Sequence, residues 1–289
     1  MMEPSEGAVQ CLSPAGLHTL RYTQWGDPHN PRVVVCVHGL ARTGRDFDRL
    51  ARVLAPQVRV VCPDVAGRGR SDWLGQPLLY QIPQYVADMV TLIARLDVAT
   101  VSWVGTSMGG LIGMGLAGMK NSPISRLVLN DVGPRLEAAA LARIGTYVGK
   151  PVRFASLDEA VAYTRTIGAG FALRSEADWR EMTASTLVPD GDGFIFHYDP
   201  AISAPLRAMT PEAAAAAEGQ LWSLFDAITA PTLLLHGAQS DLLTQATVRE
   251  MQQRGPRPAV HSFAGVGHAP MLFDADQIEP VREFLLAAA

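Results

Sequence analysis

The chain has 289 residues, of which 48% are hydrophobic and 18% charged, which is enough for one large folded domain or for a domain with an insertion. Its formal net charge of −4 disfavours nucleic acid and anionic membrane surfaces as partners. No stretch approaches the roughly 18 uninterrupted apolar residues of a membrane span, and residues 1–7 lack the basic and apolar parts of a signal peptide, so we expect a soluble cytoplasmic protein.

The first 130 residues alternate between strand signals and helix signals. Two short antiparallel strands are expected between residues 8 and 25, and the unbroken β-branched run at 32–39 is typical of a strand buried on both faces of a parallel sheet. Further strands are expected at 58–64, 100–105 and 124–130, and helices at 46–54 and 82–96. Because strands alternate with helices, the pattern predicts an α/β fold with a mostly parallel, doubly wound sheet.

This alternation stops between about residue 133 and residue 226. The segment is helical in composition, rich in aromatic residues, and contains a hairpin-like turn at 189–193. The alternation then resumes, with strands expected at 231–237 and 259–263 and helices at 244–254 and 277–288. We therefore predict a core built from residues 1–132 and 227–289, with a mainly helical cap at 133–226 inserted into it.

The sequence Gly-Thr-Ser-Met-Gly at 105–109 joins one of these strands directly to a helical stretch. A strand that enters a helix through so short a turn strains the backbone of the central residue, Ser107. Gly105 and Gly109 supply the room, because a Cβ at either position would collide with the neighbouring strand or helix. The turn is expected to raise the Ser107 hydroxyl above the end of the sheet, at a helix N-terminus where negative charge is favoured.

Other reactive residues also follow predicted strands. Asp131 directly follows the strand at 124–130, Asp241 lies just past the strand at 231–237, and His268 follows the last strand. Ligands of such sheets bind at the carboxyl ends of the strands, so these side chains are expected to converge with Ser107. A serine hydroxyl needs a base, and the base needs an orienting carboxylate, so we predict Ser107 as nucleophile, His268 as base and Asp241 as acid.

At this point the chain resembles the α/β-hydrolase fold superfamily, in particular its capped serine esterases and C–C hydrolases, over nearly its whole length. The residues that carry the resemblance are the His38-Gly39 loop, the Gly-x-Ser-x-Gly turn, the late Asp241 and the late Gly267-His268. The resemblance implies an eight-stranded sheet whose cap follows strand 6.

The resemblance also implies an oxyanion hole formed by the backbone N–H groups of Leu40 and Met108. Asp131 is the alternative acid, since some members of the family place the acid after that strand. Candidate pocket residues are His38, Arg42, Trp179, His197 and Trp222.

Several of these residues have structural alternatives. Asp241 also suits a helix N-cap, His268 suits an ordinary loop histidine, and His38 suits a hydrogen-bonding role in its loop better than that of a base. The arginines at 42, 68 and 70 are expected to stabilise loops, and one of them is a candidate for binding a substrate carboxylate.

The three cysteines, Cys11, Cys36 and Cys62, cannot form a complete set of disulfides. Cys36 and Cys62 lie in apolar strand-like runs, so buried free thiols and a reducing compartment are expected.

A serine at the turn disfavours the haloalkane dehalogenase and epoxide hydrolase chemistry of relatives that use aspartate. We predict hydrolysis of a carboxylic ester, thioester or lactone through an acyl-enzyme on Ser107, with a small-molecule substrate and without metal or organic cofactor. The alternatives are a C–C bond hydrolase of a β-diketone-like or ring-fission product, a cofactor-free perhydrolase or haloperoxidase, and a non-enzymatic small-molecule receptor. The apolar, aromatic cap suggests a fairly hydrophobic substrate, whereas the oligomeric state cannot be predicted.

Overall fold

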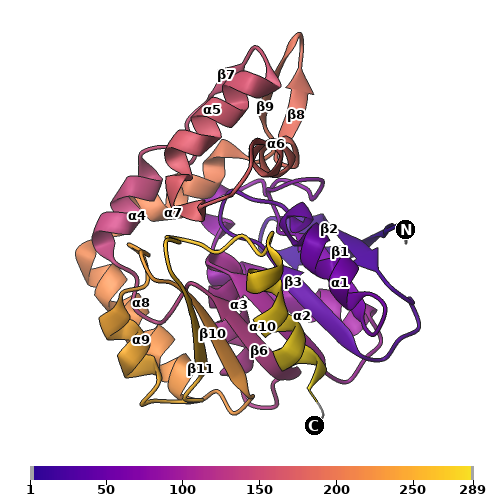
Figure 1. Cartoon of the computed structure of the whole chain (residues 1–289), viewed down its shortest axis with the longest axis vertical. Helices are drawn as coiled ribbons and strands as arrows, with labels where there is room; N and C mark the ends of the chain where they lie inside the picture. The colour runs from indigo at the N-terminus through magenta and orange to yellow at the C-terminus, as the bar shows by residue number, and fades with distance from the viewer. Residues whose placement is uncertain (1–2, 288–289) are drawn as a thin grey trace.

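The computed structural model describes residues 3–287 and is organised around an eight-stranded sheet (Figure 1). The strand order is β1-β2-β4-β3-β5-β6-β10-β11; the strands from β4 to β11 pair in parallel, and the pairs β1–β2 and β2–β4 are antiparallel. The strands are β1 Ser5–Ser13, β2 Gly16–Trp25, β3 Val33–Val37, β4 Arg59–Asp64, β5 Val101–Thr106, β6 Ile124–Asn130, β10 Thr232–Gly237 and β11 Ala259–Phe263. The predicted mostly parallel eight-stranded sheet is therefore confirmed.

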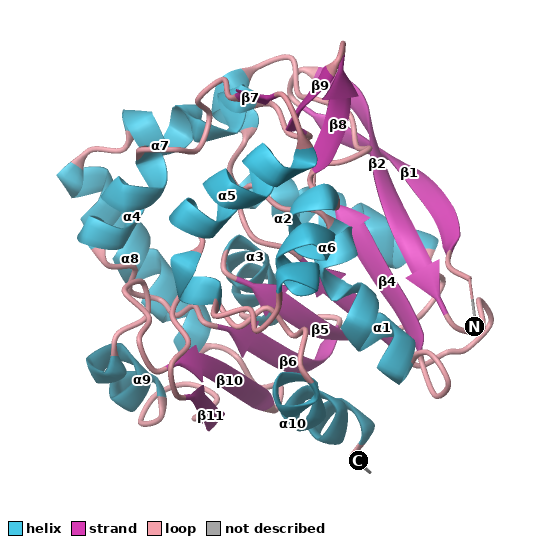
Figure 2. Cartoon of the chain, turned by 45° about the horizontal axis from the view of Figure 1, so that its top comes forward, coloured by secondary structure: helices cyan, strands magenta, loops and turns pink. Residues whose placement is uncertain are grey.

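Helices cover both faces of the sheet (Figure 2). One buried apolar cluster joins the sheet to α2, α3, α8 and α9, and a second joins its other face to α1 and α10. The bounds of these helices are α1 Asp48–Leu54, α2 Ile82–Arg95, α3 Met108–Ala117, α8 Pro211–Asp226, α9 Gln245–Met251 and α10 Ala275–Leu286. All five residues of β3 are buried, as expected for a β-branched strand that is covered on both sides.

Helix ends differ from the sequence prediction by a few residues. The helix expected at 46–54 begins as the 3₁₀ turn η1 Gly44–Phe47 and continues as α1. The helix expected from 244 begins one residue later, because the Thr244 side chain accepts the Thr247 N–H and caps α9. The last helix ends at Leu286, and the expected end at Ala288 lies outside the described residues.

The segment inserted after β6 contains five helices and a small sheet. The helices are α4 Ala138–Gly145, α5 Leu157–Ile167, α6 Glu176–Ala184, α7 Ala204–Ala208 and α8, with the short 3₁₀ turns η3 Ala169–Phe171 and η4 Pro200–Ser203. The sheet has the order β7-β9-β8, from Arg153–Phe154, Gly193–Phe196 and Leu187–Asp190, so the expectation of a mainly helical segment missed one sheet. The signals were weak because the strands have two to four residues each. The predicted turn at 189–193 closes the β8–β9 hairpin.

The C-terminal part of α8 departs from the rest of this insertion. Phe225 and Trp222 are buried in the cluster that covers the main sheet, and α8 packs against α3. Figure 1 accordingly shows α4 to α7 above the sheet and α8 beside it. Within residues 3–287, no helix is both long and apolar enough to cross a membrane.

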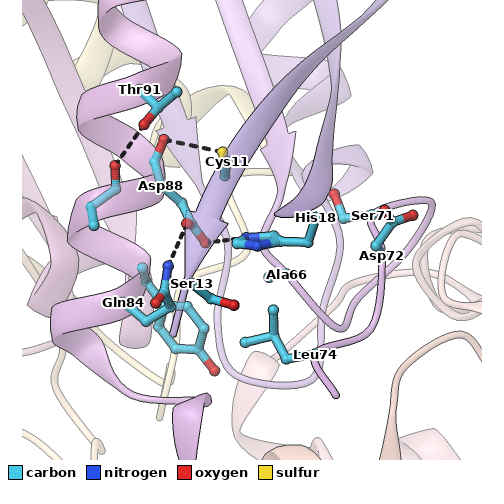
Figure 3. Close-up of polar contacts among 12 residues, drawn as sticks. Cys11, Ser13, His18, Ala66, Ser71, Asp72, Leu74, Gln84, Asp88 and Thr91 are labelled. Atoms are coloured by element: carbon cyan, nitrogen blue, oxygen red, sulfur yellow. Dashed lines mark hydrogen bonds and ion pairs between the residues drawn. The ribbon is translucent and has the colours of Figure 1, made fainter. Parts of the chain in front are cut away.

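A buried polar cluster fastens the N-terminal hairpin to α2 (Figure 3). His18 Nε2 lies 3.1 Å from Asp88 Oδ2, and the Cys11 thiol donates to the Asp88 carbonyl at 3.8 Å. Gln84 donates to the second carboxylate oxygen of Asp88 at 2.8 Å. Cys11 on β1 and His18 on β2 are cross-strand neighbours, so both strands of the hairpin contact Asp88 on α2.

We expect Cys11 to be unreactive in the folded protein. Burial, reinforced by Asp88, raises the pKa of the Cys11 thiol to about 12, and only a thiolate attacks a disulfide reagent. Titration with Ellman's reagent is expected to label no cysteine in buffer and all three in denaturant, since Cys36 and Cys62 are also buried. Fast labelling of Cys11 without denaturant, located by peptide mapping, would show instead that the hairpin opens readily.

Candidate active site

Ser107 occupies a strained turn between β5 and α3. Its φ of 53° and ψ of −116° lie in a region that residues other than glycine rarely adopt. A Cβ on Gly109 would lie 1.9 Å from the Val37 carbonyl oxygen, and one on Gly105 would lie 2.3 Å from the Gly109 carbonyl oxygen. Both glycines are therefore required for the turn that presents the Ser107 hydroxyl at the carboxyl end of the sheet.

His268 and Asp131 complete a hydrogen-bonded chain with this serine. His268 Nε2 lies 2.9 Å from Ser107 Oγ, and His268 Nδ1 lies 2.8 Å from Asp131 Oδ2. The carboxylate favours the tautomer in which Nδ1 carries the proton, which leaves Nε2 free to accept the serine proton. The arrangement can therefore turn a weak nucleophile into a reactive one at neutral pH.

The Asp131 carboxylate is completely buried and receives three hydrogen bonds. Besides His268, the Gly237 N–H donates to Oδ1 at 2.8 Å, and the Ser240 hydroxyl donates to Oδ2 at 2.6 Å. Donors of this kind stabilise a charged carboxylate away from water. They come from β10 and the loop that follows it, so these segments hold the Asp131 carboxylate at the end of β6.

The structure corrects the prediction that Asp241 contacts His268. Asp241 instead forms a two-pronged ion pair with Arg143, with Nε–Oδ2 at 2.7 Å and Nη2–Oδ1 at 3.0 Å, and is 47% exposed. The reason is an offset of one residue, because Ser240 turns its side chain toward Asp131 while Asp241 points outward. Asp241 is not a helix cap either, since Thr244 fills that role.

The spacing of the two aspartates from their strands favours Asp131 over Asp241 as the partner of His268. Asp131 follows β6 without an intervening residue, whereas Asp241 stands four residues beyond the end of β10. A side chain directly at a strand end is fixed by the sheet, while a side chain four residues later depends on the course of a loop.

The loop after β3 lies beside the serine turn and is shaped by His38. The ring is completely buried, with Nδ1 2.7 Å from the Gly39 carbonyl oxygen and Nε2 accepting the Val65 N–H at 2.9 Å. Burial, with a smaller contribution from the charges of Arg68 and Arg42, lowers the pKa of His38 to about 3, although the Gly39 carbonyl opposes this shift. His38 is thus a neutral hydrogen-bonding residue that holds the chain on either side of Leu40.

Arg68 braces both segments that are expected to form the oxyanion hole. Its buried guanidinium donates from Nε to the Leu40 carbonyl at 2.8 Å and places Nη2 3.5 Å from Met108 Sδ. The remaining amine donates to the Ala66 carbonyl and to the Tyr85 hydroxyl, both at 2.7 Å. These contacts use the guanidinium internally, so Arg68 is not available to a substrate.

A cavity between the core and the insertion opens onto Ser107 and His268. The core contributes the loop after β3 and the segment 268–271, and the insertion contributes mostly apolar and aromatic side chains. The aromatic residues among them are Tyr147, Tyr163, Phe171, Phe196 and Tyr198. An apolar pocket with a few converging polar groups is the usual form of a small-molecule site.

Of the five side chains predicted for the pocket, only Arg42 lines this cavity. Trp179 stacks on Phe171 in a cluster behind it, and Trp222 packs beside Phe225 on the main sheet. His197 and His38 serve their own loops, with the backbone of His197 paired to Gly69 and Thr186. Pattern alone could not distinguish these aromatics from those of the pocket, because the insertion has no simple periodicity.

The other two arginines considered in the sequence also have protein partners. Arg42 bonds both carboxylate oxygens of Asp46 and the Met182 carbonyl. Arg70 pairs with Glu6 and with Asp64. Arg143, which the sequence did not single out, lines the cavity together with Arg42.

Cys11, His18 and Asp88 are the one group of potential metal ligands found among the described residues. Cys11 and His18 belong to the N-terminal hairpin and Asp88 to α2 (Figure 3), and their hydrogen bonds account for the cluster as a structural contact. Within residues 3–287, no such group of potential metal ligands lies around Ser107.

Comparison with known proteins decides the family. A family model described as the alpha/beta hydrolase family matches residues 34–281. The chain belongs to the alpha/beta hydrolase family. This hydrolase is 55% identical over 289 residues to a 3-hydroxybutyrate-oligomer hydrolase of Cupriavidus necator, and the match covers 99% of each chain.

More distant relatives of the α/β hydrolase are similar over most of its length. A pimeloyl-[acyl-carrier protein] methyl ester esterase of Photobacterium profundum is 25% identical over 262 residues, covering 87% of this chain and 94% of the relative. The crystal structure of an alpha/beta hydrolase from Novosphingobium aromaticivorans superposes with a TM-score of 0.86 at 32% identity, over 99% of each chain. The protein is therefore an enzyme of the hydrolase class.

We expect His38 to make the stability of this hydrolase depend on pH. Its pKa in the folded state, about 3, lies below its ordinary value of 6.5, so the unfolded chain binds the proton more readily. The stabilisation is present at neutral pH and is lost as the pH falls from 6.5 toward 3, at up to about 1.4 kcal/mol per pH unit.

Urea unfolding at pH 7.0 and 5.5 measures this contribution when wild type is compared with His38→Asn. The variant is expected to be less stable at pH 7.0 but to lose less stability on acidification. Equal losses in the two proteins would contradict the role assigned to the neutral ring.

Proposed function

We propose that the protein hydrolyses carboxylic esters through an acyl-enzyme on Ser107, and that its substrates are short oligomers of 3-hydroxybutyrate. The observation that carries the mechanism is the chain of contacts from Ser107 through His268 to Asp131 at the end of an apolar cavity. The substrate class is supported by the Cupriavidus necator relative, which is 55% identical over the whole chain.

The first half of the reaction transfers the acyl group to the enzyme. Ser107 Oγ attacks the ester carbonyl carbon while its proton passes to His268 Nε2. The tetrahedral intermediate then expels the alkoxide, which takes the same proton from Nε2 and leaves as an alcohol. Asp131 holds the ring in position and stabilises its cationic form.

The second half repeats the sequence with water. His268 Nε2 removes a proton from water, whose oxygen attacks the acyl carbon of the Ser107 ester. Collapse of the second intermediate returns the proton to Ser107 Oγ and releases the acid.

Two backbone donors are available for the negative charge of each intermediate. The N–H groups of Leu40 and Met108 make no hydrogen bond to another described residue, and they flank Ser107. Met108 is the first residue of α3, so the helix N-terminus adds to the stabilisation of an oxyanion. We assign the oxyanion hole to these two groups, with Arg68 and His38 as positioning residues.

An oligomer of 3-hydroxybutyrate fits the chemistry of the cavity. Its repeating unit is a small ester with a methyl branch, which suits walls that are largely apolar and aromatic. The three cysteines are buried free thiols, which supports the cytoplasm as the compartment.

The acid can be identified with two matched variants and p-nitrophenyl butyrate, which carries no carboxylate. Asp131→Asn is expected to lower kcat by roughly 10³- to 10⁴-fold, because the His268 ring loses its preferred tautomer. Asp241→Asn is expected to retain activity within about tenfold of wild type, since an exposed ion pair contributes little. The opposite ranking would return the acid role to Asp241.

The nucleophile and the substrate class need a separate experiment. Intact-protein mass spectrometry with a fluorophosphonate probe is expected to show one adduct that Ser107→Ala abolishes. Chromatography of digests of 3-hydroxybutyrate dimer and trimer is expected to show monomer release by wild type only. An adduct without ester or oligomer turnover would favour C–C hydrolysis or a receptor over the proposed function.

A further inference from the structure

The cavity contains one cation whose partner can be exchanged. Arg42 and Arg143 are the arginines among the residues that line it. The side chains of Arg42 and Asp46 are only 15% and 10% exposed, and Met182 accepts a further bond from the guanidinium. Arg143 and Asp241 are 42% and 47% exposed, so water reaches both members of that pair. A carboxylate from solution can compete for Arg143 because an exposed ion pair is weak.

The position of Arg143 places this cation at the boundary between the insertion and the core. Arg143 stands in the last turn of α4, and Asp241 lies in the core loop next to Ser240, which bonds the buried Asp131. Although burial opposes it, the hydrogen-bonded charge of Arg143 holds the pKa of the Asp241 carboxyl below its ordinary value. Arg143, which lines the cavity beside Ser107, is thus paired with the loop whose Ser240 bonds Asp131.

The geometry already shows how Arg143 receives a carboxylate. Asp241 engages Nε and Nη2 in the two-pronged arrangement in which guanidinium groups bind carboxylates most specifically. Tyr147, four residues after Arg143, also lines the cavity. Burial raises the pKa of the Tyr147 hydroxyl, which therefore keeps its proton and can donate it to a bound carboxylate.

We propose that Arg143 binds the free carboxylate of the substrate, in exchange with Asp241, and so selects acid-terminated hydroxyacid oligomers. This inference rests on the proposed function, because a 3-hydroxybutyrate oligomer carries one carboxylate, at the end of its alcohol portion. That carboxylate is the anionic partner that gives a cation such as Arg143 a role in an otherwise largely apolar cavity. Asp241 occupies the site until the substrate arrives, and it repels carboxylates that do not reach the guanidinium.

The test compares 3-hydroxybutyrate trimer with its methyl ester, in which a neutral ester replaces the terminal carboxylate, and follows by chromatography only the cleavage between hydroxyacid units. With the acid trimer, Arg143→Met is expected to raise KM by roughly 10- to 100-fold, the range of a lost hydrogen-bonded charge pair. Asp241→Asn is expected to act in the opposite direction and lower KM for the acid trimer, because Arg143 loses its competitor. With the methyl ester, both variants are expected to change KM much less.

Arg135→Met is the matched control for loosening the insertion. Arg135 pairs with Glu218 on α8 and, like Arg143, joins the insertion to the core through Glu250 on α9, but it does not line the cavity. It is expected to leave the ratio of KM values for acid and methyl ester unchanged. Circular dichroism and thermal unfolding of each variant confirm that the comparison concerns folded enzyme.

The outcomes separate the two proposals. Suppose that wild type cleaves the trimer, but that each variant, Arg143→Met and Asp241→Asn, changes KM equally for the acid trimer and its methyl ester. The ion pair then only connects the insertion to the core, and the carboxylate site is wrong. Equal KM values of wild type for acid and methyl ester would also overturn it. If wild type cleaves p-nitrophenyl butyrate but neither trimer, the proposed substrate class itself fails, and the carboxylate site falls with it.

Discussion

The buried carboxylate of Asp131 is the contact on which the site depends. It gathers a ring nitrogen from His268, a backbone N–H from the end of β10 and a hydroxyl from the following loop. A charged group without access to water must keep such donors, because an unpaired one is very unfavourable. The same bonds that make the charge tolerable therefore align β6, β10 and the histidine loop. His268 Nε2 can lie 2.9 Å from Ser107 Oγ only while this alignment holds.

Around this centre, buried contacts of the core fix the loops beside Ser107, and the insertion covers them. The serine turn packs so closely on its neighbours that Gly105 and Gly109 leave no room for a Cβ. Arg68 and His38 fix the neighbouring loop through hydrogen bonds to buried groups. The insertion supplies the opposite wall, with aromatic side chains on short helices and a three-stranded sheet. The proposed catalytic residues and the proposed substrate wall thus come from different parts of the chain, an arrangement that lets one fold support many reactions.

Charge is distributed around the cavity in an equally uneven way. The side chains of the Arg42–Asp46 pair are largely buried, whereas those of the Arg143–Asp241 pair are exposed to solvent. A surface pair contributes little to the stability of the fold, so its position at the rim of a cavity has more consequence for ligands than for folding. The ion pair that made Asp241 unsuitable as the acid is thus the feature that gives it a part in the proposed recognition of substrate.

The sequence alone determined the features that depend on neighbours along the chain. The β-branched runs predicted the parallel strands, the glycines at 105 and 109 predicted the serine turn, and the positions of Ser107 and His268 after strands predicted their approach. Only the tertiary structure decided which carboxylate contacts His268, because a loop offset of one residue turns Ser240 inward and Asp241 outward. It also decided which side chains of the insertion face the cavity, since short irregular elements carry no period that distinguishes their inner face from their outer face.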